Sequence, residues 1–227
     1  MCGRLDLNQP AAAVVLRFPE LDGWRPSRAW PNDRGYNTPP GVSIPVVIER
    51  SGERQVSERI WGPGVRIQGR WKQVINAKLD RLMESAMWKP AMMRGHRGVV
   101  AANGYYEWQR RAPGSKQPYY VCRTDGRPMA LAALYGRAPI RADGEKEPTV
   151  VVVTRDPCGG LEAIHDRIPL ELPDDWVAFW LDSVGEVDIA ALERVDPTRN
   201  WQWWPVSTRA NSPSNDDRSV IAPVANA

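Results

Sequence analysis

The sequence has few of the residues that cross-link a small protein or hold a metal ion in it. Its 227 residues include three cysteines, Cys2, Cys122 and Cys158, and two histidines, His96 and His165. An odd number of cysteines without C-x-x-C spacing argues against a disulfide framework and against a zinc ribbon. Two histidines are too few for a multi-histidine site, so we expect neither a metal nor a cofactor.

Long apolar runs are also missing. No stretch approaches the roughly 18–20 residues of a membrane span, and Arg17 and Glu20 interrupt the apolar stretch near the N-terminus, which argues against a signal peptide. Hydrophobic residues make up 42% and charged residues 25% of the chain, with a mean hydropathy of −0.47. This composition predicts a globular protein, and we expect a cytoplasmic monomer without membrane contacts.

Positive charge is concentrated in the middle of the chain. Residues 60–127 hold 13 Lys and Arg against 4 Asp and Glu, whereas residues 140–227 hold 8 against 16. Four tryptophans interleave with the basic segment: Trp61, Trp71, Trp88 and Trp108. Surfaces for single-stranded nucleic acids combine cations that follow the phosphates with aromatic faces that stack on bases. The alternative is a solvated basic face with the tryptophans in the core, and composition alone leaves both open.

Short runs typical of β-strands predict an α+β protein with a largely antiparallel sheet. These runs are Ile44–Ile48, Gly98–Ala102, Pro118–Arg123, Met129–Leu134 and Thr149–Thr154. Asp125-Gly126 predicts a hairpin turn between the third and fourth of them. No composition break divides the chain, so we expect one domain over residues 1–210. The polar, proline-containing residues 211–227 are expected to form a disordered tail.

Helices are predicted at four places from apolar spacing and capping residues. One covers Leu79–Met87 and ends before Pro90, and another has Asp174 as its N-cap. The second is expected to bury Trp176, Phe179 and Trp180 on one face. The remaining two cover residues 10–17 and 188–195.

Cys2 is the first residue with distinctive chemistry. Removal of Met1, which aminopeptidases perform when the next side chain is small, leaves an amine and a thiol on the same carbon. With ordinary pKa values of about 8 and 8.5, both are accessible as nucleophiles near neutral pH. An aldehyde that meets this pair forms an imine with the amine and is then trapped by the sulfur as a five-membered thiazolidine. A cysteine at position 2 is by itself usually incidental.

Three further residues are candidates for acid, base or orienting roles. Glu107 lies among aromatic residues after an apolar strand, where loss of solvation raises a carboxyl pKa. His165 follows an apolar stretch and precedes an Asp-Arg pair, and its imidazole titrates near neutral pH. Asn76 precedes the Leu79 segment and is placed to orient a carbonyl or hydroxyl group. Each also has a structural alternative: a surface ion pair, a satisfied structural histidine and a helix cap. For His96 we expect a structural role.

Seven separated motifs occur together in one order along the chain. They are Met1-Cys2-Gly3-Arg4, Tyr36-Asn37-Thr38-Pro39-Pro40-Gly41, Trp61-Gly62, Ile75-Asn76-Ala77-Lys78, Asn103-Gly104-Tyr105-Tyr106-Glu107-Trp108, Ile164-His165-Asp166-Arg167-Ile168-Pro169 and Trp204-Pro205-Val206-Ser207. In this series the chain resembles the SOS response-associated peptidase (SRAP) family, the abasic-site processing proteins. The resemblance implies an α+β domain with a barrel-like, mixed or antiparallel sheet and peripheral helices.

The resemblance also implies a role for each matching residue. Cys2, exposed by autocatalytic or aminopeptidase removal of Met1, would form a thiazolidine with the aldehyde of an abasic site in single-stranded DNA. Glu107 would handle protons at the Cys2 amine, His165 would help to open the sugar ring, and Asn76 would hold Cys2 or the sugar. Contacts to DNA are implied for Arg4, Asn37, Pro40, Lys78 and Arg167. Peptidase and lyase activities are among those that the family implies.

Two departures from the family pattern concern the DNA contacts. The family usually has arginine and glutamate where this chain has Lys78 and Asp80, and lysine lacks the bidentate fork of arginine for a phosphate. Family members often carry tryptophan soon after the Trp-Gly motif as a wedge that opens the strand. In this chain Trp71 is the candidate for that wedge.

Two other classes of function remain alternatives. A peptidase that uses Cys2 as an N-terminal nucleophile on peptide substrates would also use Cys2, Glu107 and His165. This alternative gives no reason for the basic, tryptophan-rich segment. A single-strand DNA-binding module without a covalent step would be indifferent to abasic sites and would dissociate completely in high salt.

Overall fold

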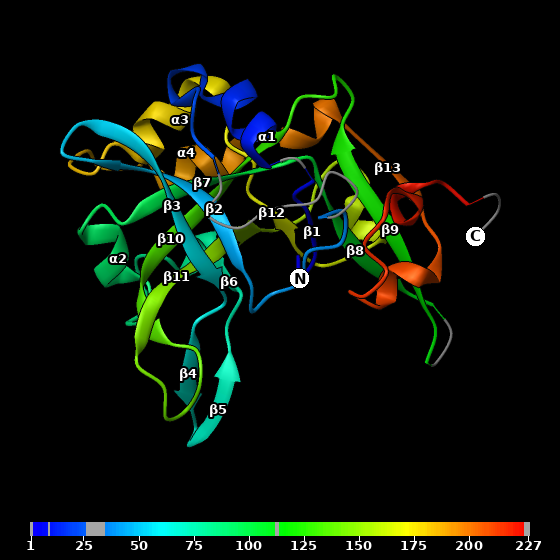
Figure 1. Ribbon diagram of the computed structural model, residues 1–227, viewed down its shortest axis with the longest axis horizontal. Helices are drawn as coiled ribbons and strands as arrows, with labels where there is room; N and C mark the ends of the chain where they lie inside the picture. Colours follow the sequence, from blue (N-terminus) through cyan, green and yellow to red (C-terminus); the bar gives the residue numbers. More distant parts are fainter. Residues whose placement is uncertain (1, 9, 26–34, 112–113, 225–227) are drawn as a thin grey trace.

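A closed five-stranded β-barrel lies at the centre of the computed structural model, which describes residues 2–8, 10–25, 35–111 and 114–224. The strands are β1 (Leu5–Asp6), β2 (Ser43–Arg50), β3 (Glu53–Trp61), β4 (Gly64–Ile67), β5 (Arg70–Gln73), β6 (Asn76–Lys78), β7 (Arg97–Ala102), β8 (Gly104–Arg110), β9 (Lys116–Arg123), β10 (Met129–Pro139), β11 (Lys146–Arg155), β12 (Ile168–Pro169) and β13 (Trp201–Pro205). The helices are α1 (Pro10–Arg17), α2 (Lys89–Met93), α3 (Asp174–Leu181) and α4 (Ile189–Arg194) (Figure 1).

The barrel closes because β11 pairs with strands on both of its sides. Its strand order is β10-β7-β2-β3-β11, and β11 also pairs with β10, which completes the ring. Within this ring β3 and β11 run parallel, and the other pairs are antiparallel. At the end of β11, β6 pairs with it in parallel and β12 in antiparallel register. The prediction of an α+β protein with a mixed, barrel-like sheet is confirmed.

A second sheet, of strand order β1-β8-β9-β13, packs against one side of the barrel. Along β10, side chains alternate between two clusters, as the two-residue period of a strand requires. Leu131 and Ala133 join the cluster that the barrel shares with Tyr105 of the second sheet. Ala132 and Leu134 join the cluster beneath the helices. Strand β7, the first half of β10 and the middle of β11 are therefore buried on both faces, which explains their continuous apolar sequences.

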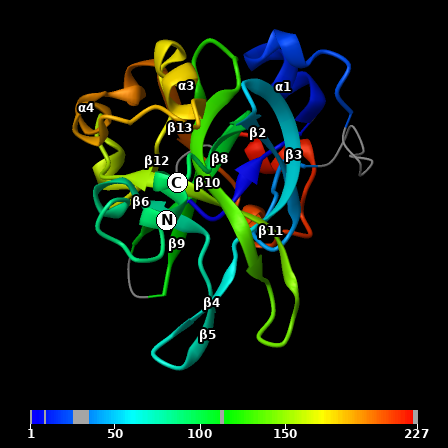
Figure 2. The same ribbon diagram turned by 90° about the vertical axis from the view of Figure 1, so that its left-hand side faces the viewer.

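Helices α1, α3 and α4 gather at one end of the barrel (Figures 1 and 2). Two helix predictions need correction. Helix α3 buries Val177, Trp180 and Leu181, whereas Phe179 is 65% exposed. The segment after Leu79 forms only a 3-10 turn, η2 (Leu79–Arg81), and Pro90 lies in the first turn of α2. Proline suits the first turn of a helix because that amide has no intrahelical partner, so Pro90 marks a helix start.

The Asp125-Gly126 turn does not join a hairpin, so that prediction is wrong. Strand β9 pairs with β8 and β13, whereas β10 pairs with β7 and β11 in the other sheet. The turn forms locally as predicted, with Gly126 at φ 70° and the Asp125 carboxylate accepting from Arg123 and from the Arg127 amide. Turn chemistry thus identified a reversal of the chain, but the chain crosses there between the two sheets.

Strands β4 and β5 form a two-stranded arm that projects from the barrel in both views (Figures 1 and 2). Trp71 lies across the arm, and a Cβ atom added at Gly64 would come within 1.9 Å of its ring. Only glycine therefore allows this close approach. Trp71 is half-buried, so this candidate wedge is held on the arm, with part of its surface accessible.

The segment after β13 packs on the outer face of the second sheet, contrary to the expected disordered tail. It contains η5 (Thr208–Asn211) and η6 (Arg218–Ile221), and Val220 is fully buried. The Trp204 indole donates to the Ile221 carbonyl at 2.8 Å. Polar composition suggested disorder because the partners of these groups lie far away in sequence. Residues 225–227 lie outside the described residues.

Asn37 is the residue that holds this segment. Its side chain is fully buried, and its amide donates to three carbonyls, those of Ala210, Ser212 and Asn215. The Asn37 backbone amide also donates to Asp216 at 2.7 Å. Each of these contacts crosses more than 170 positions of sequence, which is why local composition did not reveal them.

We expect Asn37→Ala to lower the free energy of unfolding by about 2–4 kcal/mol, because it leaves buried carbonyls without a donor. Residues 211–224 should become the first site of limited proteolysis. Asn211→Ala is the matched control, since its exposed amide makes one bond, to the Trp108 indole. Equal denaturant midpoints for the two variants would contradict the role given to Asn37.

Candidate active site

Cys2 lies in the core between the barrel and the second sheet. It is fully buried, and its neighbour Leu5 begins β1, which pairs with β8 so that Leu5 lies opposite Tyr105. The Tyr106 amide donates to the Arg4 carbonyl at 3.1 Å, so the chain before Arg4 runs beside Glu107. Burial, and then the charge of Glu107, raise the pKa of the Cys2 thiol far above its ordinary value.

Two features of the Asn103–Trp108 motif fix this arrangement. The Asn103 side chain donates to the Asn8 carbonyl at 2.7 Å and so fastens the end of β1. A Cβ atom at Gly104 would lie 2.5 Å from the Val121 carbonyl, so only glycine lets β8 approach β9 this closely. The motif therefore sets the register that brings Glu107 to Cys2.

Glu107 and His165 meet across about sixty residues of sequence. His165 Nε2 lies 3.2 Å from Glu107 Oε1, and Glu107 is 2% exposed. Burial raises the pKa of Glu107 to about 7, which places this carboxyl between its acid and base forms at neutral pH. Burial also lowers the pKa of His165, so the neutral ring is favoured. The pair can therefore exchange protons close to Cys2.

The loop that carries His165 is fastened on both sides. The Gln109 side chain of β8 donates to the Ala163 carbonyl at 2.9 Å, which ties the loop to the strand of Glu107. His165 Nδ1 accepts from the Arg167 amide at 3.1 Å and lies 2.7 Å from Asp166 Oδ1. His165 Nδ1 thus faces one donor and one carboxylate, whereas Nε2 faces Glu107.

Asn76 begins β6, beside β11. The Trp61 indole donates to the Ile75 carbonyl at 3.0 Å, so the Trp61-Gly62 motif fixes the backbone immediately before Asn76. Gly62 has φ 98°, and a Cβ atom there would lie 2.9 Å from the Ile75 side chain. Both polar atoms of the Asn76 amide are buried without a hydrogen-bond partner among the described residues. Such a side chain is available to bind a ligand oxygen.

The residues expected to contact DNA differ in their access to solvent. Lys78 is exposed on β6, and Pro40 is half-buried. Arg167 is only 5% exposed, and it binds Asp156 at 2.5 Å and the Thr154 carbonyl at 2.8 Å.

Two expected DNA contacts therefore take a structural position here. Asn37 holds the C-terminal segment, and Arg167 holds the end of β11. Arg4 is half-buried and donates to Asn37 at 2.8 Å, with its guanidinium 5.6 Å from the centre of the Trp108 ring. Arg4, Asn37 and Arg167 all have protein partners here, and their contacts with DNA remain predictions.

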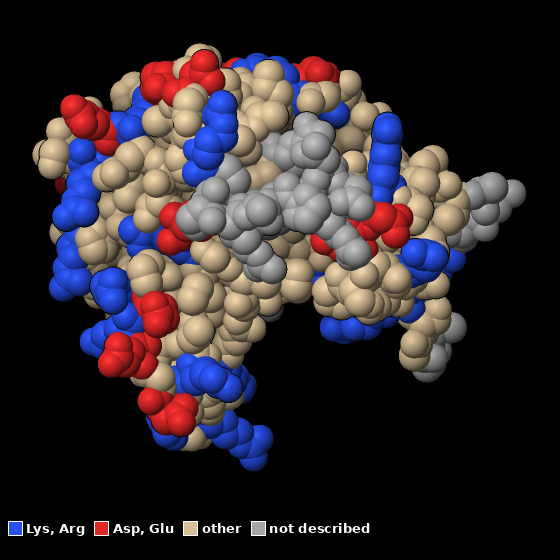
Figure 3. Space-filling view, viewed as in Figure 1, with Lys and Arg blue, Asp and Glu red and all other residues tan. Residues whose placement is uncertain are grey.

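The surface is hollowed between the β4–β5 arm and the lobe formed by β9 and the C-terminal segment (Figure 3). Exposed cations lie on both sides of it. The arm carries Arg66, Arg70 and Lys72, and the β8–β9 hairpin carries Arg110 and Lys116.

Other cations of the basic segment are not available to a ligand. Arg97 is buried and donates to the Trp180 carbonyl, and Arg123 is paired with Glu171 and Asp125. Among the tryptophans of this segment, Trp61 is a core residue, as the alternative reading of the composition proposed.

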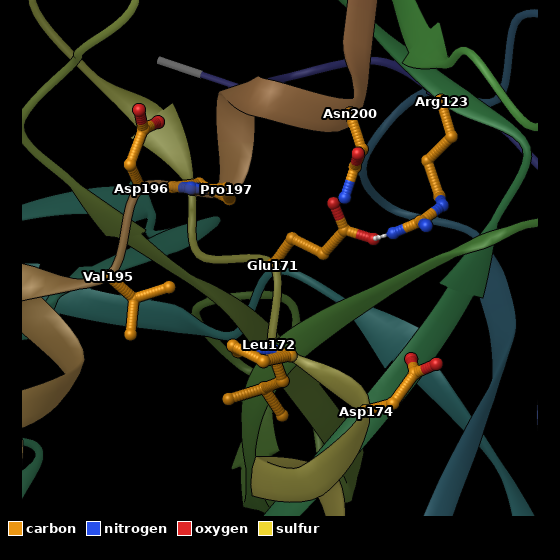
Figure 4. Close-up of a pocket in the computed structure, with 9 residues that line it drawn as sticks. Arg123, Glu171, Leu172, Asp174, Val195, Asp196, Pro197 and Asn200 are labelled. Atoms are coloured by element: carbon orange, nitrogen blue, oxygen red, sulfur yellow. Dashed lines mark hydrogen bonds and ion pairs between the residues drawn. The ribbon is translucent and has the colours of Figure 1, made fainter.

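A separate pocket of about 280 Å³ lies by the end of β9 (Figure 4). Arg123 and Glu171 line it and bind each other at 2.7 Å, and the Trp201 indole also donates to Glu171. None of the candidate site residues lines this pocket. Its one arginine is already neutralised, so the pocket offers little to an anionic ligand.

Two other kinds of site have no candidate within the part of the chain that the structure describes. No group of three or more His, Cys, Asp or Glu side chains there is placed to hold a metal ion. Of the helices in those same ranges, none has the length and apolar character needed to cross a membrane.

Comparison with known proteins identifies the family of this chain. The sequence profile of the SOS response associated peptidase (SRAP) family matches residues 1–213. The chain belongs to the SRAP family. It is 30% identical to the abasic site processing protein YedK of Escherichia coli, over 99% of this chain and 100% of that protein.

A further curated relative and two solved structures are also similar to this chain. The abasic site processing protein HMCES of Gallus gallus is 26% identical, over 99% of this chain and 78% of its own length. A solved structure from Bacteroides thetaiotaomicron has a TM-score of 0.75 and 22% identity, and the match covers 99% of this chain and 100% of that one. A phage-related protein from Bordetella bronchiseptica has a TM-score of 0.68 and 28% identity, with 90% of this chain and 94% of that one covered.

Sequence reasoning missed two residues that lie close to the candidate site. Gln109 fastens the His165 loop, and Tyr105 lies buried in the same cluster as Cys2. A signal for Tyr105 was present: in a strand, residues two apart face the same side, so Tyr105 shares the face of Glu107. No comparable pattern marks Gln109, whose partner is a backbone carbonyl in a distant loop.

Proposed function

We propose that this protein captures abasic sites in single-stranded DNA as a covalent thiazolidine on Cys2, after Met1 has been removed. The observation that carries the proposal is the meeting of Cys2, Glu107 and His165 from three distant parts of the chain, with Cys2 and Glu107 buried and His165 half-buried. Family membership and the names of the relatives support the same substrate.

The chemistry needs only proton transfers. Hydrolysis of the Met1–Cys2 bond consumes one water and frees the Cys2 amine. That amine attacks the aldehyde carbon of the open sugar, and loss of water gives an imine. The Cys2 sulfur then forms a bond to the imine carbon, the π electron pair moves to nitrogen, and the thiol proton ends on that nitrogen. The product is a five-membered ring containing both heteroatoms.

Each residue near Cys2 has a role in these reaction steps. Glu107, with its pKa raised to about 7 by burial, protonates the leaving hydroxyl during imine formation. His165 moves the proton of the sugar hydroxyl as the closed ring opens, because its Nε2 lies within reach of the Glu107 carboxyl. Asn76 binds a sugar oxygen with its unpartnered amide. The hollow between the two sets of cations holds the phosphates on either side of the lesion.

Intact mass spectrometry tests the proposal directly. We expect purified protein to lack the mass of Met1, and to gain the mass of an abasic oligonucleotide less one water. An oligonucleotide with the same sequence and no abasic site should give no adduct. The variant Cys122→Ser is the control, since this free thiol packs on the other face of the second sheet, away from the Cys2 cluster, and it should react fully. Cleavage of peptides without any DNA adduct would instead support a peptidase.

Lys78→Glu should weaken binding to every single strand, because an exposed cation two residues from Asn76 becomes a repelling carboxylate. The slope of log affinity against log salt should become shallower by about one, as expected for one lost phosphate contact. Lys89→Glu, the same charge change on exposed α2, serves as the control. Equal slopes for the two variants would place the DNA away from β6.

A further inference from the structure

Tyr105 is a buried polar residue that the proposed mechanism does not use. Its side chain is fully buried, and its hydroxyl has no hydrogen-bond partner among the described residues. Buried tyrosine hydroxyls usually have a partner, since leaving one unpaired costs about 1–3 kcal/mol. A tyrosine kept at such a cost is a candidate for binding a group that arrives with the substrate or forms during the reaction.

The position of Tyr105 restricts what its hydroxyl can meet. Tyr105 and Glu107 lie two residues apart on β8, so both side chains point from the same face, roughly 7 Å apart along the strand. That face belongs to the cluster containing Cys2. Leu5 of β1, three residues after Cys2, lies directly opposite Tyr105. The Trp201 ring packs edge-on against Tyr105, with ring centres 5.8 Å apart, and fixes its orientation.

The charges around the hydroxyl point to the same neighbours. Burial raises the pKa of Tyr105 well above its ordinary value, and the next largest effects come from Glu107 and then Cys2. The hydroxyl therefore stays protonated at any pH at which the protein works. It is a permanent hydrogen-bond donor placed among groups that become negative.

We propose that the Tyr105 hydroxyl donates a hydrogen bond to the Cys2 sulfur while that sulfur attacks the imine carbon, which makes Tyr105 a catalytic residue of ring closure if the proposed function holds. Tyr105 keeps its proton throughout. The thiol proton passes to the Glu107 carboxylate and from there to the nitrogen that receives the electron pair, so no further reactant is needed.

The need for such a donor follows from the burial of Cys2. A thiol whose pKa is raised by burial contributes little thiolate at neutral pH. A hydrogen bond to the sulfur lowers that pKa, and thiolate nucleophilicity falls by only about half a log unit for each pKa unit. The gain in thiolate therefore exceeds the loss in reactivity. Imine formation uses the amine and gains nothing from this bond.

The test separates the two covalent steps. Full-length processed protein is mixed with abasic single-stranded DNA, in parallel with and without cyanoborohydride, which reduces the imine to a stable amine. Tyr105→Phe should reach the wild-type yield with cyanoborohydride. Without it, the stable crosslink should form about 10-fold more slowly, the factor for one lost hydrogen bond to a charged group.

Tyr106→Phe is the matched control. Tyr106 is the next residue of β8, it is equally buried, and its hydroxyl donates to the Tyr36 carbonyl at 2.6 Å on the opposite face of the sheet. In this variant, the ratio of the crosslink yield without cyanoborohydride to the yield with it should equal that of the wild-type protein. The same ratio in all three proteins, or an equal loss of both yields in Tyr105→Phe, would overturn the role of Tyr105.

Two further measurements keep the outcomes distinct. If Tyr105→Phe fails to fold, a fluorotyrosine at position 105 preserves the shape and strengthens the donor, and it should accelerate ring closure; an unchanged rate would overturn the proposal. The pH profile of closure should also move upward in Tyr105→Phe, a change that a packing role does not produce. Failure of the proposed function itself would appear separately, as wild-type protein that forms no adduct under either condition.

Discussion

A chain extended at its N-terminus, so that Cys2 stays internal, is expected to form no stable crosslink with abasic DNA. The extension converts the Cys2 amine into an amide, which cannot form an imine, and without the imine the thiol has no carbon to attack. Affinity for single-stranded DNA should change little, because the exposed cations of the arm, of Lys78 and of the β8–β9 hairpin remain. Denaturing gels and filter binding measure the two properties on the same preparation.

The matched control is an extension that a protease removes immediately before Cys2. Cleavage should restore the crosslink to the level of the ordinary protein, which shows that the extension acted by blocking the amine and not by unfolding the site. A full yield of adduct from the uncleaved protein would rule out thiazolidine formation at Cys2.

Glu107→Gln is expected to slow crosslinking by about 100-fold, the lower end of the range for general acid–base catalysis. The amide retains the shape of the carboxyl group and loses its exchangeable proton. The pKa of Glu107 is about 7, so the wild-type rate should depend on pH around neutrality as the acid form is lost. The variant should lack this dependence. Crosslinking rates of both proteins, measured between pH 5 and pH 9 with an abasic oligonucleotide, test whether Glu107 is the source of this pH dependence.

The same substitution should increase stability at high pH. Burial raises the pKa of Glu107 from 4.5 to about 7, so the native state binds more protons than the unfolded state between these values. The free energy of unfolding therefore falls as pH rises through this window. The glutamine side chain of the variant does not ionise and carries no such penalty. The advantage of the variant should therefore grow by on the order of 3 kcal/mol between pH 4.5 and pH 8.

Asp6→Asn is the control for a buried carboxyl group that takes no part in the proposed reaction. Asp6 is 2% exposed, burial raises its pKa to about 6, and it accepts from the Tyr120 hydroxyl at 2.8 Å, away from Cys2. It should show a similar pH-dependent change in stability and a normal crosslinking rate. An equal slowing in both variants would mean that Glu107 acts only by supporting the fold.

The sequence predicted strands better than it predicted their partners. The runs at Ile44–Ile48 and Thr149–Thr154 became β2 and β11, because a continuous apolar run suits a strand that is buried on both faces. Their pairing depends on contacts between distant segments, such as the parallel pair of β3 and β11. The Asp125-Gly126 turn failed for this reason, since nothing local distinguishes a hairpin from a crossing between sheets.

The candidate site shows the same difference between local signals, which the sequence reveals, and long-range contacts, which it does not. The chemical types of Cys2, Glu107 and His165 made them candidates from sequence, and the structure adds the distance of 3.2 Å between Glu107 and His165. The DNA contact that the family resemblance implies for Asn37 remains a prediction; in the structure its amide donates to the carbonyls of a segment about 175 residues later. Whether a polar side chain meets solvent or backbone depends on long-range packing, and a single sequence read by itself does not reveal that packing.

The burial of Cys2 also sets a time limit on its maturation. Strand β1 pairs with β8, whose Tyr105 is synthesised one hundred residues after Leu5. At about 5–20 residues per second, a ribosome needs roughly 5–20 s for that stretch. We therefore expect an aminopeptidase that exposes Cys2, as the proposed function requires, to act mainly in this interval, because Cys2 is fully buried in the folded protein.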